Sequence, residues 1–166
     1  MDKDMQNAMR EISRSRIHKL WVKAKNNDME GVTEEDKRTM KVILEHEDDY
    51  AEIYDKAESM GDYEFDPETE HNPFLHITMH TIVENQLAER KPIEVYQFYL
   101  AMRQKKYPRH DTIHLISNIF IRLLFRVLKY KEPFDLEQYK FLLKKYKNRK
   151  PEKIYDLLDQ EDEEEE

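Results

Sequence analysis

The sequence predicts an all-α protein, folded as a single-domain bundle of about five to seven helices. Only two glycines and six prolines occur among 166 residues. Glu, Lys, Leu, Met and Arg are abundant, which favours helix because straight side chains lose little rotamer freedom there. Apolar residues recur at intervals of three and four positions, which is typical of helices that cover a core with one face.

Capping and breaking residues set the expected ends of the helices in the first half of the chain. The first apolar stripe ends before Gly31, and Thr33 is a good N-cap that is followed by acidic residues. From Gly61 onward about a dozen residues lack a helical period and should form a loop. Asn72 and Pro73 then favour a new helix as its N-cap and first residue. The predicted helices are 4–25, 34–58 and, after the loop at 61–72, 73–88.

Prolines separate the helices expected in the second half of the chain. Pro92, Pro108 and Pro133 lie between apolar stripes, where proline removes a backbone donor and restricts the residue before it. The most apolar stretch, 115–128, contains one Asn and two Arg. It is shorter than the roughly 20 apolar residues of a membrane span, so we expect a buried core helix. The predicted helices are 93–104, 110–130 and 136–147, with a last turn at 151–158.

Charge and composition predict one helical domain followed by an acidic tail. The net charge of −8 comes mostly from six consecutive acidic residues at 161–166. Such a terminal run of like charges is typical of a disordered tail. We therefore expect a helical domain at 1–155 and a disordered acidic tail at 156–166. The first residues lack the basic and then apolar pattern of a signal peptide, so a cytoplasmic protein is expected.

Histidines are the most concentrated chemistry in the sequence. The chain has no cysteine, which excludes thiolate metal sites and cysteine nucleophiles, so a metal would have to bind to histidines and carboxylates. His76, His80 and Glu84 are spaced by four and share one face of a predicted helix. His110 and His114 repeat this spacing on another helix. Such pairs on neighbouring helices are typical of metal sites in helical bundles.

The sequence therefore predicts a metal site shared by two helices, with a divalent transition ion such as iron, zinc or nickel as the cofactor. His46 lies in an acidic stretch, where it could add a ligand oriented by Glu45 or Tyr50, or lie on a solvated helix face. His71 could be a ligand, a cap or a loop contact. The alternative for the paired histidines is that they form hydrogen bonds at helix starts or lie half exposed. The predicted ligand set is His46, His76, His80, Glu84, His110 and His114. The paired histidines form its core, and Glu84 is either a fifth ligand or a residue that supports the ligands.

The same residues carry a resemblance to a known family. Residues 72–80, Asn-Pro-Phe-Leu-His-Ile-Thr-Met-His, with Glu-Asn-Gln at 84–86, resemble the bacterial family called domain of unknown function 1841. Members of that family carry a very similar NPFLHxxxH segment and a second HxxxH downstream, and the resemblance spans about 21–139. They commonly have an acidic residue one or two turns after the second HxxxH, where this sequence has Asn118 and Arg122. This departure favours a mononuclear, histidine-rich site.

The sequence leaves open both the reaction and whether the protein is an enzyme. A metal-dependent hydrolase and an iron protein that handles oxygen both fit a histidine-rich site. The alternative is a non-enzymatic interaction module, whose basic C-terminal helix with Lys140, Lys144 and Lys145 contacts nucleic acid or an acidic partner. An ordinary surface helix explains those lysines as well, so nucleic acid is the weaker expectation. The aromatic run at 96–107 raises the further hypothesis of a homodimer, and no membrane contact is expected.

Overall fold

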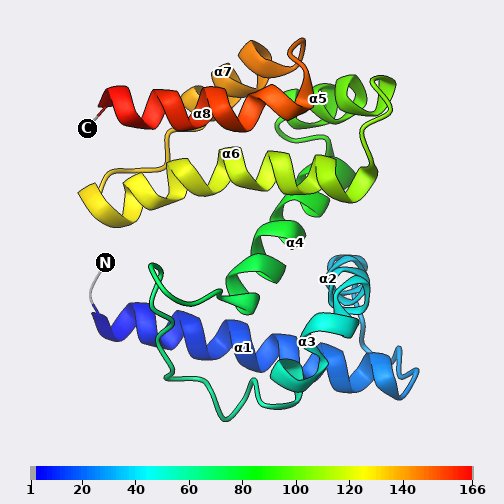
Figure 1. The fold of residues 1–166 in the computed structure, drawn as a ribbon. Helices are drawn as coiled ribbons and strands as arrows, with labels where there is room; N and C mark the ends of the chain where they lie inside the picture. The colour runs from blue at the N-terminus through cyan, green and yellow to red at the C-terminus, as the bar shows by residue number, and fades with distance from the viewer. Residues whose placement is uncertain (1–2, 166) are drawn as a thin grey trace. The chain divides into compact units, whose positions relative to one another are not determined.

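The computed structural model describes residues 3–165, which form eight helices and, within that range, no strand (Figure 1). The predicted all-α class is therefore confirmed. Contacts along the chain divide it into two compact units, Met1–Thr81 (unit 1) and Ile82–Glu166 (unit 2). The helices are α1 Lys3–Lys25, α2 Glu34–Glu45, α3 Glu47–Asp55, α4 Pro73–Glu89, α5 Ile93–Gln104, α6 Arg109–Tyr130, α7 Leu136–Tyr146 and α8 Pro151–Glu165.

The helix count exceeds the predicted range because the helix expected at 34–58 is split at His46. The His46 backbone N–H donates to the Ile43 carbonyl at 3.2 Å, and the His46 carbonyl accepts from the Tyr50 N–H at 3.0 Å. One residue thus ends α2 and begins α3. Three acidic residues fill the first turn of α3, where the positive end of the helix dipole favours negative charge. Helical structure was correctly predicted here, but the structure has two helices, α2 and α3, where one continuous helix was predicted.

Side-chain caps fix two helix starts as the sequence predicted. Thr33 Oγ1 accepts a hydrogen bond from the Asp36 N–H at 3.0 Å, and Asp36 Oδ2 accepts one from the Thr33 N–H at 3.1 Å. This reciprocal pair is a capping box. Asn72 Oδ1 accepts from the Leu75 N–H at 3.1 Å. The second cap sets the start of α4, so that His76 lies one turn inside that helix.

Unit 1 is built on contacts of α1 with α2 and α3. Trp21, Ile43 and Tyr54 lie in its buried core, and the Trp21 and Tyr54 rings are 5.2 Å apart. The same unit buries a charged residue, Arg14, which is 2% exposed. Arg14 donates to the Tyr63 carbonyl at 2.7 Å, which fastens the loop at 61–72 to α1.

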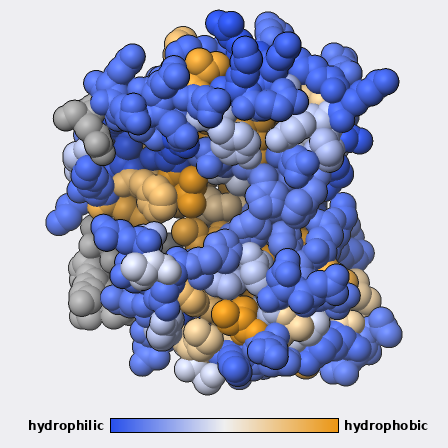
Figure 2. All heavy atoms as spheres, viewed as in Figure 1, coloured by the Kyte–Doolittle hydropathy of each residue, from blue (hydrophilic) through white to orange (hydrophobic). Residues whose placement is uncertain are grey.

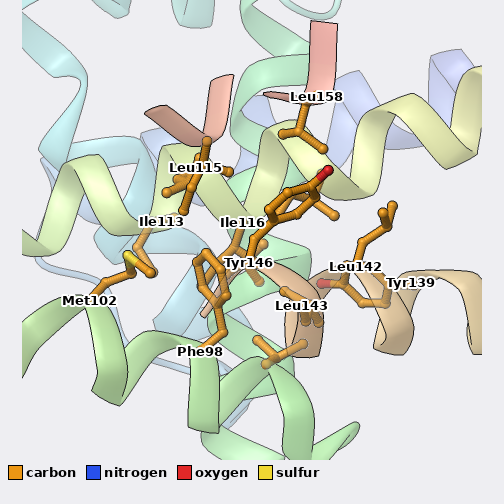
Figure 3. Packing of buried hydrophobic residues seen from close by; sticks show 14 of the residues in the cluster. Phe98, Met102, Ile113, Leu115, Ile116, Tyr139, Leu142, Leu143, Tyr146 and Leu158 are labelled. Carbon is orange, nitrogen blue, oxygen red and sulfur yellow. The ribbon is translucent and has the colours of Figure 1, made fainter. Parts of the chain in front are cut away.

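Unit 2 has its own core, in which α5, α6 and α7 contact one another (Figure 3). Phe98, Ile116 and Leu143 are fully buried in this core. Tyr139 is also fully buried, and its hydroxyl donates to Gln86 Oε1 at 2.8 Å. Since one residue of each contacting helix is fully buried, the packing of unit 2 depends on all three helices.

The apolar stretch at 115–128 is buried over its first half, as predicted for a core helix. Leu115 and Ile119 are fully buried, whereas Phe125 is 49% exposed and Leu128 is 47% exposed. Among the described residues, none of the helices combines the length and the apolar character that crossing a bilayer requires. The face of the molecule in Figure 2 is mostly hydrophilic, with smaller hydrophobic areas.

Acidic residues of α8 form ion pairs with basic residues of α6 and α7. Arg122 contacts Asp159 at 2.6 Å and also pairs with Asp162, while Lys145 pairs with Glu161. Figure 1 shows α8 running alongside α6. The boundary predicted between the helical domain at 1–155 and the acidic tail at 156–166 falls within α8, which spans Pro151–Glu165.

Candidate metal centre

Three histidine side chains of unit 1 meet where α4 contacts the junction of α2 and α3. The ring centroids of His46 and His76 are 4.9 Å apart, those of His46 and His80 are 4.9 Å apart, and those of His76 and His80 are 4.4 Å apart. His46 is 7% exposed and His80 is 2% exposed. The spacing of His76 and His80 along α4 directs both rings to His46, as their shared helix face predicts. Within unit 1, the structure thus brings the predicted ligands His46, His76 and His80 together.

The protonation state of the His46 ring follows from its hydrogen bond. His46 Nδ1 lies 2.7 Å from the Val42 carbonyl oxygen. A carbonyl only accepts hydrogen bonds, so Nδ1 carries a proton and, in the neutral ring, Nε2 is the unprotonated nitrogen. This Nε2 lies 3.1 Å from His76 Nε2. Histidines that bind metals commonly donate their other ring N–H to a carbonyl in the same way.

The distance between the two Nε2 atoms fits ligands of one metal ion. Two nitrogens bound at roughly 2.0–2.1 Å are roughly 3.0 Å apart at a right angle and roughly 3.4 Å apart at the tetrahedral angle. The 3.1 Å between His46 and His76 falls inside that range. An N–H···N hydrogen bond between the rings has a similar length. The distance therefore fits both states, and a metal measurement distinguishes them.

The second predicted pair, His110 and His114, forms a local arrangement at the start of α6 in unit 2. Their Nε2 atoms are 2.9 Å apart and their ring centroids are 4.5 Å apart. His110 is exposed and His114 is half-buried. The predicted spacing of four residues on one helix face is therefore present here as well, with both Nε2 atoms directed at each other.

The carboxylate of Glu84, the sixth predicted ligand, is bonded to an arginine. Glu84 Oε1 and Oε2 each accept a hydrogen bond of 2.7 Å from Arg109. This ion pair is bidentate, and its carboxylate end is largely buried because Glu84 is 8% exposed. Arg109 directly precedes His110, and the ion pair therefore holds the start of α6 against α4. Arg109 could not be predicted as the partner of Glu84, because helix spacing does not reveal a partner on another helix.

Tyr50 and His71 extend the histidine cluster of unit 1. The Tyr50 hydroxyl lies 2.6 Å from His71 Nε2. Burial raises the pKa of Tyr50, so the phenol keeps its proton at neutral pH. The hydroxyl donates to His71 Nε2 when that ring carries its own proton on Nδ1. The Tyr50 ring also stacks on His46, with centroids 5.7 Å apart and 6° between the planes. His71 is exposed at the end of the loop. Of the roles predicted for it, the structure shows a loop contact, which it makes with Tyr50.

Fold and site together define an all-α protein with a histidine cluster at a helix junction. A family model described as Domain of unknown function (DUF1841) matches residues 9–145, and the chain belongs to this family. The resemblance seen in the NPFLHxxxH segment is thereby confirmed. All six predicted ligands lie inside the matched region. No curated protein and no solved structure gives a significant match.

Proposed function

We propose that this protein binds a divalent transition-metal ion and that His46, His76 and His80 are ligands. The supporting observation is the cluster of three rings with centroids 4.4 to 4.9 Å apart, in which His46 Nε2 is directed at His76 Nε2. Imidazole nitrogen suits iron, zinc, nickel and copper. The bond from His46 Nδ1 to the Val42 carbonyl leaves Nε2 in the form that a metal needs.

Burial of the cluster is a second argument for a bound ion. Imidazole rings withdrawn from water must have their polar atoms satisfied, or they cost several kcal/mol. A single ion bound to the three rings would satisfy one nitrogen of each ring. An ion with an open coordination position supplies either an activated water or a site for oxygen. Hydrolysis and oxygen chemistry are therefore both proposed reaction classes.

We further propose His110 and His114 as metal ligands of unit 2. The sequence predicts that they serve the same ion as His76 and His80, and the number of ions per chain tests this prediction. One ion per chain supports a shared site, and two ions support separate sites. Because both oxygens of Glu84 are bonded to Arg109, we assign Glu84 a supporting role next to His110, in place of a direct ligand role.

Elemental analysis of tag-free protein, purified without chelator, tests metal binding. We expect near-stoichiometric metal in the wild type and its loss in His80→Ala. The melting temperature of His80→Ala should no longer rise when metal is added, because a ligand at about 100 times its Kd stabilises the folded state by about 2.7 kcal/mol.

His18→Gln is the matched control for this experiment. His18 Nδ1 bonds to the Tyr54 carbonyl at 2.9 Å, so this variant removes a structural histidine of unit 1 and should keep its metal. Wild-type protein that remains metal-free after reconstitution with iron, zinc and nickel would refute the proposal. Full metal content in His80→Ala would refute it equally.

The alternative function, a basic helix that binds nucleic acid, gains no support from the lysines of α7. Lys140 lies 3.2 Å from Glu137, Lys144 lies 3.6 Å from Glu94, and Lys145 pairs with Glu161. Paired lysines offer less positive charge to a phosphate backbone. The homodimer and the cytoplasmic location stay predictions, and light scattering over a wide concentration range tests the first of them.

A further inference from the structure

Tyr50 combines two features that suit a tyrosine for one-electron chemistry. Its hydroxyl lies 2.6 Å from His71 Nε2, which is a base when the ring proton is on Nδ1. Its ring lies against two proposed metal ligands, stacked on His46 at 5.7 Å and edge-on to His76 at 5.9 Å. The other two tyrosines of unit 1, Tyr54 and Tyr63, do not combine these two features. Tyr54, for example, donates to the Ile43 carbonyl, which is not a base.

We propose that Tyr50 and His71 form a redox pair that supplies one electron to reactions of hydrogen peroxide at the histidine centre. The inference rests on the proposed function, with iron as the bound ion. It adds a substrate class, peroxide, and gives a role to two residues outside the metal ligand set.

The hydrogen bond explains why Tyr50 can give up an electron. Removing an electron from a phenol makes its O–H strongly acidic, so the electron leaves readily only when a base takes the proton. His71 Nε2 takes it along the existing 2.6 Å bond, without movement of either ring. Since His71 is exposed, water hydrates the imidazolium that forms, and its charge is not trapped in an apolar site.

The electron has a short route from Tyr50 to the centre. The Tyr50 and His46 rings are parallel within 6°, and the His46 Nδ1 bond to Val42 fixes the His46 ring in that orientation. The backbone adds a further constraint, because the Tyr50 N–H donates to the His46 carbonyl at 3.0 Å. Electron donor and proposed ligand are thus held together by both main chain and side chain.

The proposed step balances in electrons and protons. Hydrogen peroxide accepts two electrons and two protons from solvent and becomes two waters. A ferrous ion held by His46, His76 and His80 would supply one electron and end as a ferric ion. Tyr50 supplies the other electron, and its phenolic proton passes to His71 Nε2. The protein products are a neutral tyrosyl radical at Tyr50 and an imidazolium at His71, and no hydroxyl radical is released.

The test is electron paramagnetic resonance of iron-loaded protein that is mixed with an equimolar amount of peroxide and frozen at once. Protein is loaded with ferrous iron without oxygen, and its iron content is measured first. We expect a tyrosyl radical signal in the wild type. Tyr50→Phe should keep its iron and lose the signal. His71→Gln should keep its iron and lose most of the signal, because the proton acceptor is gone.

Tyr63→Phe is the matched control for this experiment. Tyr63 also donates to a base, Glu70 Oε1, at the same distance of 2.6 Å, but its ring packs on Phe65. The radical should therefore persist unchanged in Tyr63→Phe. Iron-loaded wild type without a tyrosyl radical, an equal signal in Tyr50→Phe, or an equal signal in His71→Gln would overturn the redox pair alone. Wild type that takes up no iron would overturn this inference, and wild type that takes up neither iron, zinc nor nickel would overturn the proposed function with it.

Discussion

Replacing Arg109 by Met tests the buried ion pair that supports the start of α6. The Glu84 side chain is 10% exposed and the Arg109 side chain is 36% exposed. Arg109→Met leaves the Glu84 carboxylate buried with its main partner removed. Breaking a fully buried pair costs about 3–5 kcal/mol. Because water partly screens Arg109, we expect a loss of about 2 kcal/mol in the free energy of unfolding.

Replacing the acidic partner, Glu84, should cost less than replacing Arg109, and the prediction depends on this difference. Glu84→Gln leaves a guanidinium that water can reach, and the Gln amide oxygen still accepts one hydrogen bond. We expect a loss of about 1 kcal/mol. The double variant should cost less than the two single losses together, because the two residues are in contact. In a chain of this size about 2 kcal/mol corresponds to a fall of roughly 4–8 °C in Tm.

Urea unfolding followed by far-ultraviolet circular dichroism measures these differences. The control is Arg10→Met, which removes an exposed pair with Glu64 at 3.4 Å and should change the unfolding free energy by less than about 0.5 kcal/mol. If Arg109→Met cost no more than Glu84→Gln, the burial of the Glu84 carboxylate would not be the source of the stability.

Three further predictions concern stability. Thr33→Ala removes half of a capping box and should cost about 1 kcal/mol in urea unfolding, whereas Thr33→Ser should be nearly neutral. Bonds from the Thr33 backbone N–H and the Arg16 guanidinium hold the pKa of Asp36 below its usual value. The ionised carboxylate thus contributes stability above the unfolded-state pKa, and this is lost as pH falls through the folded-state pKa. Asp36→Asn should flatten this acid dependence, and an unchanged pH profile would contradict the assignment. Tyr139→Phe removes the hydroxyl that donates to the half-buried Gln86 amide oxygen and should cost about 1–2 kcal/mol by the same assay; a neutral result would show that Gln86 finds another partner.

Helix ends were predictable from the sequence because caps act within a few residues. Asn72 and Pro73 placed the start of α4 correctly, and the helix predicted at 93–104 agrees with α5, Ile93–Gln104. The break at His46 was not predictable in this way. The sequence there contains neither Gly nor Pro, and the interruption depends on how α2 and α3 each pack on α1. Tertiary packing routinely overrides local propensity of this kind.

The candidate site was predictable where it depends on the spacing within one helix. Spacing by four residues predicted that His76 and His80 share a face, and their rings are 4.4 Å apart. The same spacing placed Glu84 on that face and made it a predicted ligand. Its partner comes from another helix, however, and Arg109 occupies both carboxylate oxygens. A helix pattern specifies which face a residue lies on, and it says nothing of which long side chain reaches that face from elsewhere.

The role of His46 in the fold determines which substitution tests the site cleanly. His46 bonds to Val42 of α2 through its ring, and its carbonyl accepts from Tyr50 of α3. Replacing His46 would therefore remove a proposed ligand, disturb the junction of the two helices and displace the ring that stacks on Tyr50. His80 lies in the middle of α4, where Ala is the best helix former. Loss of metal in His80→Ala would consequently report on coordination, whereas the same loss in a His46 variant would be equally explained by a change at the α2–α3 junction.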